Sequence, residues 1–171
     1  GRVDMVFSNA GVTAGSHLQD MKEDNWDWVM GINFNGVINS TRAFIPHLVN
    51  NSEAAIVNTS SIFGMVAVPG QSVYHATKFA VRGFTESLAL EMKQTNPNLQ
   101  IHCVHPGHIG TNIATTARMS DEDFEIFKEK LIPLTKTKNN SPFLATLSTH
   151  YAQNFKQLDT YQFCPSPLDY V

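Results

Sequence analysis

Residues 54–81 read AAIVNTSSIFGMVAVPGQSVYHATKFAV, and they contain the strand and the helix that decide the fold. The short apolar run over 54–59 predicts a buried strand. Residues 73–93 predict a long helix whose apolar positions are Phe79, Val81, Phe84, Leu88, Leu90 and Met92. A strand followed by a long helix is the unit from which parallel α/β sheets are built.

The same alternation of strand and helix extends on both sides of this stretch. Strands are predicted over 5–7, which ends at Asn9-Ala10-Gly11, and over 99–105, which ends at Pro106-Gly107. Helices are predicted over 20–30, over 32–49 and, after a cap at Ser120, over 120–130. The pattern therefore predicts an α/β fold with a parallel sheet of three recognisable strands.

Composition excludes several classes of protein. The chain has 171 residues, of which 42% are hydrophobic and 16% are charged, a balance typical of a globular domain. Its formal net charge of −3 offers no basic stripe for nucleic acid, and we see no apolar run long enough to span a membrane. Because two cysteines form no disulfide framework, we expect a cytoplasmic protein.

Three histidines, His102, His105 and His108, follow one another near the end of the third predicted strand. A metal site would need carboxylate or thiolate ligands to complete this set, and no such pattern accompanies it. We therefore expect no metal.

Tyr74 and Lys78 lie four positions apart at the start of the predicted helix, so their side chains share one face. A phenol has a pKa of about 10, and a nearby cation lowers that pKa. The pair therefore suits proton transfer to or from an alcohol. Taken alone, the same spacing also fits an exposed pair of an aromatic and a cationic residue on a helix.

Other polar and glycine positions fall at the strand ends or on the facing helices. Ser61 follows the second strand, thirteen positions before Tyr74, and Asn33 precedes that strand on a helix. Ligands of open α/β sheets bind at the carboxyl ends of the strands. Ser60 is the alternative candidate to Ser61, and Asn35 is the alternative candidate to Asn33.

In this order and spacing, the motifs resemble those of the classical short-chain dehydrogenases/reductases. They are Ser8-Asn9-Ala10-Gly11, Asn33, Ser61, Tyr74-x-x-x-Lys78 and Pro106-Gly107-x-x-x-Thr111, and the resemblance extends from residue 1 to about residue 130. It implies a partial Rossmann-like, doubly wound parallel sheet with flanking helices. It also implies NAD or NADP as the cofactor.

The resemblance implies a role for each position. Tyr74 would be the general acid/base, and Lys78 would lower its pKa and hold the nicotinamide ribose. Ser61 would bind the substrate oxygen, and Asn33 would anchor a water that relays protons through Lys78. The residues that would contact the cofactor, besides Tyr74 and Lys78, are Asn9, Ala10 and Gly11 beside the adenosine, and Pro106, Gly107, Ile109 and Thr111 near the nicotinamide.

The sequence departs from the family pattern at both ends. No glycine-rich dinucleotide turn precedes Asn9, so the chain is expected to lack the N-terminal βαβαβ half of the fold. Residues 1–135 are interpreted as the catalytic half of the family's domain, and residues 136–171 as an atypical C-terminal tail.

The expected activity is hydride transfer between NAD(P) and a small-molecule secondary alcohol or ketone. A lipophilic substrate is favoured by apolar residues expected to border the site, namely Phe63, Val68, Ile113, Met119, Phe124 and Phe127. We expect a homo-oligomer that pairs through the helices over 32–49 and 73–93. The alternative is a truncated, catalytically impaired fragment that acts at most as a dimerisation or binding partner.

Overall fold

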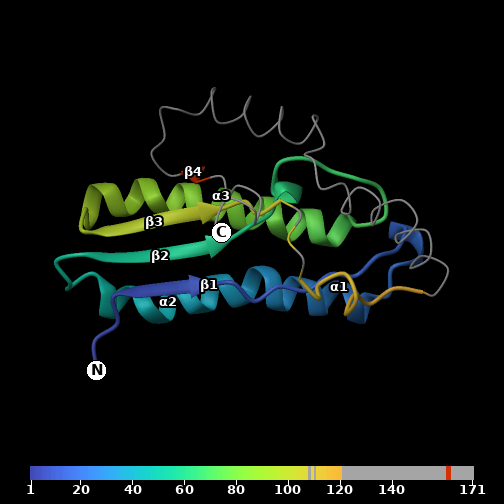
Figure 1. Ribbon diagram of the computed structural model, residues 1–171, viewed down its shortest axis with the longest axis horizontal. Coiled ribbons are helices and arrows are strands. Elements are labelled where there is room, and N and C mark those ends of the chain that lie inside the picture. The colour runs from blue at the N-terminus through green and yellow to red at the C-terminus, as the bar shows by residue number, and fades with distance from the viewer. Residues whose placement is uncertain (108, 110, 121–160, 163–171) are drawn as a thin grey trace.

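The computed structural model of the chain describes residues 1–107, 109, 111–120 and 161–162. Four parallel strands form one sheet in the order β1-β2-β3-β4 (Figure 1). Their bounds are Met5–Ser8, Ala54–Thr59, Leu99–Val104 and Tyr161–Gln162. The three predicted strands and the parallel α/β fold are confirmed. The two-residue β4 pairs with β3 from within the segment interpreted as an atypical tail, where no strand was predicted.

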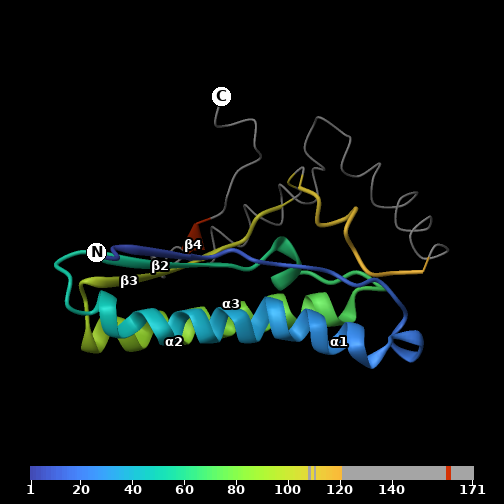
Figure 2. The same ribbon diagram turned by 90° about the horizontal axis from the view of Figure 1, so that it is seen from below.

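Helices α1, α2 and α3 lie on one side of the sheet; α2 and α3 cover its face, and α1 extends past the ends of the strands (Figure 2). They span Glu23–Met30, Gly36–Leu48 and Ser72–Thr95. The two helices predicted over 20–30 and 32–49 are in fact one continuous run, because a π-turn at Gly31–Asn35 joins α1 to α2. Gly31 keeps helical backbone angles there, φ −59° and ψ −46°, so this glycine does not break the helix.

The core forms where alternate strand residues face the helices. Its buried members are Val6, Leu48, Ala54, Ile56, Leu88, Leu99 and Ile101. In a strand, every second side chain points to the same face, so alternate residues of each strand face α2 and α3. A second, smaller cluster of Ala14, Val29 and Val73 packs α1 against the start of α3.

The loops that follow the strands are tied together at one edge of the sheet. The pairing of β2 with β3 continues beyond the strands, because the Ser60 amide donates to Val104 O at 2.9 Å and the Ile62 amide donates to Pro106 O at 2.9 Å. The Thr59 hydroxyl donates to Asn9 Oδ1 at 3.2 Å and so joins the ends of β2 and β1. The loops that carry Asn9, Ser61 and Pro106 therefore meet at the carboxyl end of the sheet.

The remaining structural predictions concern the later part of the chain and the membrane. The helix predicted over 120–130 lies outside the described residues, apart from Ser120, which is not helical. None of the helices that the structure describes combines the length and the apolarity that crossing a membrane would require.

Gly64 allows the loop after β2 to pack closely on α3, and this contact gives a prediction for stability. A Cβ at position 64 would clash with Ser60 Oγ and would lie 2.8 Å from the carbonyl oxygen of Lys78. We expect Gly64→Ala to lower the free energy of unfolding by about 1–3 kcal/mol, as overpacking does. Urea denaturation of the two proteins measures this difference in the free energy of unfolding.

Gly83 provides the matched control. It lies in α3, and a Cβ built there meets nothing within 4 Å. Gly83→Ala is expected to raise the free energy of unfolding by up to about 1 kcal/mol, because alanine is the better helix former. Equal effects of the two substitutions would contradict the close packing at Gly64.

Candidate active site

Asn33 lies inside the π-turn and is fully buried, with none of its surface exposed. Its Oδ1 accepts from the Val12 amide at 2.8 Å, and its Nδ2 donates to Val12 O at 2.9 Å and to Thr77 Oγ1 at 3.2 Å. The side chain therefore joins the loop after β1 to α3. Its rival Asn35 is exposed.

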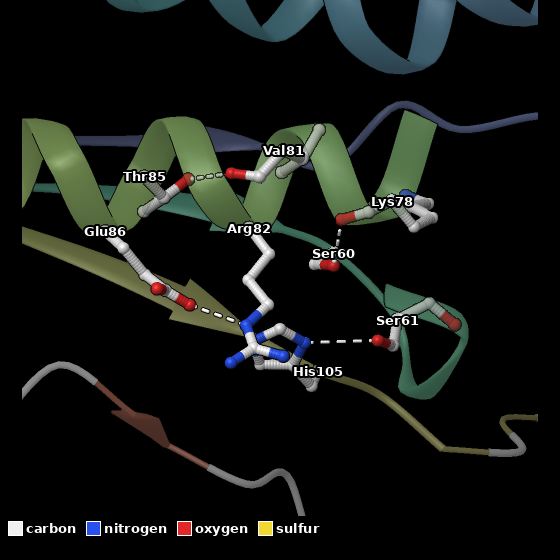
Figure 3. Close-up of polar contacts among 8 residues, drawn as sticks. All are labelled: Ser60, Ser61, Lys78, Val81, Arg82, Thr85, Glu86 and His105. Atoms are coloured by element: carbon white, nitrogen blue, oxygen red, sulfur yellow. Dashed lines mark hydrogen bonds and ion pairs between the residues drawn. The ribbon is translucent and has the colours of Figure 1, made fainter. Parts of the chain in front are cut away.

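Ser61 and Ser60 follow β2 directly, but their hydroxyls face different neighbours. The Ser60 hydroxyl donates to the backbone carbonyl of Lys78 at 2.8 Å (Figure 3). Ser61 Oγ accepts from the Phe63 amide at 3.1 Å, and the Ser61 side chain also acts on the pKa of the Tyr74 phenol, which it lowers. Ser61 therefore lies beside the phenol, whereas Ser60 ties the loop to α3.

Tyr74 and Lys78 occupy the first two turns of α3 and share a face, as their spacing predicts. Both are buried, and Lys78 Nζ lies 5.6 Å from the centroid of the Tyr74 ring. The ammonium donates to Thr59 O at 2.9 Å, which draws it towards the carboxyl end of β2. The geometry therefore brings a phenol, a hydroxyl and a cation together at the end of the sheet.

The pKa of Tyr74 differs from the sequence-based expectation. Lys78 was expected to lower it, but burial raises the pKa above its ordinary value, and the hydrogen bond to Ser61 lowers it by less. Burial in a medium of low dielectric disfavours the charged phenolate. In this chain Tyr74 therefore holds its proton at neutral pH.

Burial also acts on Lys78, and it lowers the pKa of the ammonium to about 8. The removal of water disfavours the cation. Lys78 is thus protonated at neutral pH but titrates at lower pH than an exposed lysine would.

Asn9, Ala10 and Gly11 form the loop directly after β1. Asn9 and Ala10 are exposed and Gly11 is half-buried. A Cβ built on Gly11 would lie 3.5 Å from Lys78 Nζ and 3.7 Å from Asn33 Oδ1. The absent side chain of Gly11 therefore leaves the ammonium and the amide oxygen facing a common space.

The segment after β3 carries the other predicted cofactor contacts. Pro106 is half-buried and bonded to the loop after β2, whereas Gly107 and Thr111 are exposed. The Thr111 amide donates to Ile109 O at 2.7 Å, which closes a tight turn. Among the described residues, the hydrogen bonds of Ile109 and Thr111 join them to each other and to Ile113, and none links them to Tyr74 or Lys78.

Sequence reasoning missed two histidines that hold the loop carrying Ser61. The Nδ1 atom of buried His105 lies 3.1 Å from the carbonyl oxygen of Ser61, next to the ion pair of Arg82 with Glu86 (Figure 3). His75, one position after Tyr74, contacts the same loop on its far side. His105 belonged to the set rejected as metal ligands, and nothing in the spacing of either histidine signals a backbone partner.

The described residues hold no cluster of three or more histidine, cysteine, aspartate or glutamate side chains suited to a metal ion. His108, one of the three histidines considered, lies outside them. Cys103 is buried and its thiol is free, and burial raises its pKa to about 12. A thiol with that pKa is a core filler and not a nucleophile.

Comparison with known proteins identifies the family. The short chain dehydrogenase family model matches residues 1–122. SadH of Mycobacterium tuberculosis, whose name assigns it provisionally as an oxidoreductase, is 43% identical over 130 residues, covering 75% of this chain and 47% of SadH. The 3-oxoacyl-[acyl-carrier-protein] reductase of Thermotoga maritima is 39% identical over 111 residues, covering 65% of this chain and 44% of that reductase.

Two solved structures resemble the fold. A short chain dehydrogenase/reductase from Burkholderia phymatum in complex with NAD has a TM-score of 0.76 and 28% identity, covering 95% of this chain and 61% of that protein. A gluconate 5-dehydrogenase from Burkholderia cenocepacia in complex with NADP and tartrate has a TM-score of 0.62 and 28% identity, covering 66% and 44%.

This chain spans about half the length of the curated relatives it matches, between 44% and 50% in three of them. The family model, in contrast, covers most of the chain, and SadH is well above 30% identical over three quarters of it. The chain belongs to the short-chain dehydrogenase/reductase family.

Proposed function

We propose that this chain carries the proton-transfer site of an NAD(P)-dependent oxidoreductase that interconverts secondary alcohols and ketones. The observation that carries the proposal is the pair of buried side chains on one face of α3, with Lys78 Nζ 5.6 Å from the centroid of the Tyr74 ring. This arrangement can give a proton to a carbonyl oxygen or take one from an alcohol.

The residues beside this site fit a dinucleotide. The space beside Gly11, which a Cβ would fill, is bordered by Lys78 Nζ and Asn33 Oδ1. Two structurally similar proteins were solved with NAD and with NADP. We assign one side of the cofactor to Asn9, Ala10 and Gly11 and the other to Pro106, Gly107, Ile109 and Thr111. When bound, the nicotinamide supplies or accepts the hydride.

Tyr74 holds the proton that ketone reduction consumes. Because burial raises its pKa, the phenol stays protonated until it can donate to the carbonyl oxygen of the substrate. The Ser61 side chain acts on the Tyr74 phenol, so its hydroxyl can orient the same substrate oxygen. Alcohol oxidation uses these groups in reverse, with Tyr74 as the acceptor of the proton.

Lys78 and Asn33 are suited to holding a water behind Tyr74. Lys78 uses one of its three donors on Thr59 O, which leaves two. Asn33 uses both amide hydrogens, and one lone pair of its Oδ1 remains. These remaining groups border the space beside Gly11, which supports a water that passes a proton between Lys78 and bulk solvent.

A lipophilic substrate is supported by Phe63, which lies beside the phenol, and by half-buried apolar side chains on the loops after β2 and β3. The Phe63 ring lies edge-on to the Tyr74 ring, with 6.3 Å between the ring centroids. Val68, Ile113 and Met119 are half-buried on the neighbouring loops. An apolar surface with a few fixed polar groups is typical of small-molecule sites. Of the other apolar residues named for this role, Phe124 and Phe127 lie outside the described residues.

A homo-oligomer through α2 and α3 is supported by apolar exposure on α3. Phe79 is 42% exposed and Leu90 is 53% exposed. Gly83 lies between them, and a side chain built there meets nothing within 4 Å. The same surface favours the second candidate function, a binding partner without catalysis, and the next experiment separates the two.

Replacement of Tyr74 by phenylalanine removes only the phenol oxygen. We expect Tyr74→Phe to lower kcat for ketone reduction by at least about 10²–10⁴-fold, the contribution of general acid catalysis. NAD(P)H consumption measures the rate, and an unchanged melting temperature serves as the control for folding. Retained turnover would refute the proton-transfer role, and absence of turnover in the unaltered protein would favour the binding partner.

The pH profile of ketone reduction tests Lys78. Reduction needs both Lys78 and Tyr74 protonated, and Lys78 loses its proton first because its pKa is about 8 while burial raises that of Tyr74. We expect kcat/KM to be level at lower pH and to fall as the pH rises through about 8. In Lys78→Arg the guanidinium stays charged, so the fall should move to higher pH. The same midpoint in both proteins would exclude Lys78 as its origin.

A further inference from the structure

His75, on α3, contacts the loop between β2 and α3 at two positions. Its Nε2 lies 3.0 Å from the Val68 amide, and its Nδ1 lies 3.0 Å from the carbonyl oxygen of Phe63. An amide only donates and a carbonyl only accepts, so Nε2 carries no proton and Nδ1 carries one. The contacts therefore require the neutral imidazole with its hydrogen on Nδ1.

The first part of the loop has backbone hydrogen bonds of its own. The Gly64 amide donates to Ser61 O, and the amides of Met65 and Val66 donate to Ile62 O, at 2.9 to 3.1 Å. The far end of the loop is built differently. Pro69 has no amide hydrogen, and Gly70 has a φ of +81°. His75 accepts from the Val68 amide, the last before these two residues, and so fastens this part of the loop to α3, while Gly70 O accepts from the Ser16 amide at 2.9 Å.

The same imidazole also contacts the ring that faces the phenol. The centroids of Phe63 and His75 are 4.8 Å apart in a tilted arrangement, and Phe63 is edge-on to Tyr74. Phe63 is thus held by its backbone oxygen and by its ring. His75 is itself only 6% exposed, which leaves little freedom for the ring to turn away.

We propose that His75 is a positioning residue that fixes the loop 63–68, and with it the apolar wall formed by Phe63, against Tyr74. It touches no reacting atom in this arrangement. It acts through Phe63 and Val68 and sets which ketones can approach the phenol. This inference rests on the proposed function, since it describes how the same site selects its substrate.

Amide hydrogen exchange tests whether His75 holds the Val68 amide, and this measurement needs no enzymatic activity. In His75→Phe, which keeps a buried ring of similar shape, the Val68 amide should exchange about tenfold or more faster, because a buried hydrogen bond is lost. The Val66 amide, bonded to Ile62 O, should change little and serves as the internal reference. His75→Gln, whose side-chain oxygen can take the place of Nε2, should restore protection of Val68. If His75→Phe proves unfolded, the exchange rate of the Val68 amide is compared between His75→Gln and His75→Asn, because the shorter asparagine side chain cannot reach Val68.

Steady-state kinetics tests the consequence for substrates. We expect KM for bulky apolar ketones to rise about tenfold in His75→Phe, with kcat less affected, because Tyr74 is unchanged. His47→Phe, a change at an exposed histidine of α2, should leave both constants unaltered. Unchanged exchange at Val68, or faster exchange with KM unaltered, would overturn the proposal. Absence of turnover in the unaltered protein would instead overturn the proposed function, while the exchange experiment would still decide whether His75 holds the loop.

Discussion

The site depends on the three hydrogen bonds of the Asn33 amide. Its partners are both backbone groups of Val12 and the hydroxyl of Thr77, so one side chain joins the loop after β1, the π-turn and α3. Because Asn33 is completely buried, leaving any of these groups unpaired would be costly. The π-turn is where α1 passes into α2, and such turns are frequent at functional sites. Gly11, just before Val12, is thereby held beside Lys78.

Burial explains how this arrangement treats protons. The same removal of water raises the pKa of Tyr74 and lowers that of Lys78, so the two pKa values lie closer together than in water. The hydrogen bond from Lys78 Nζ to Thr59 O compensates part of the cost of burying the ammonium. The loop after β2 contributes Ser61 to the phenol and is fastened on one side by His105 and on the other by His75. These side chains are thus held in place by groups of the protein itself, and such preorganisation favours the proposed proton transfer.

Much of this could be predicted from the sequence, and the part that could not has physical reasons. The strands were identifiable as short apolar runs, and α3 was identifiable because its apolar period of 3.6 reflects burial directly. The Tyr74 and Lys78 pair was identifiable because helix geometry fixes its shared face. The π-turn could not be identified from the sequence, since Gly31 gives no local sign that α1 passes into α2 through such a turn. Other features depend on contacts between distant segments, which no local pattern encodes. They are the choice between Ser60 and Ser61, the role of His75 and the strand β4. The predicted direction of the Tyr74 pKa shift was wrong, because burial raises this pKa by more than Ser61 lowers it.

The most direct test of this account is urea denaturation of Asn33→Leu against Asn35→Leu. Both changes replace an amide by an apolar side chain of similar size in the same π-turn. The account predicts that Asn33→Leu lowers the free energy of unfolding by about 1–3 kcal/mol, because the backbone groups of Val12 lose buried partners. Asn35→Leu, at an exposed position, should change it by no more than about 0.5 kcal/mol. Equal effects of the two substitutions would contradict the claim that the Asn33 amide holds the site together.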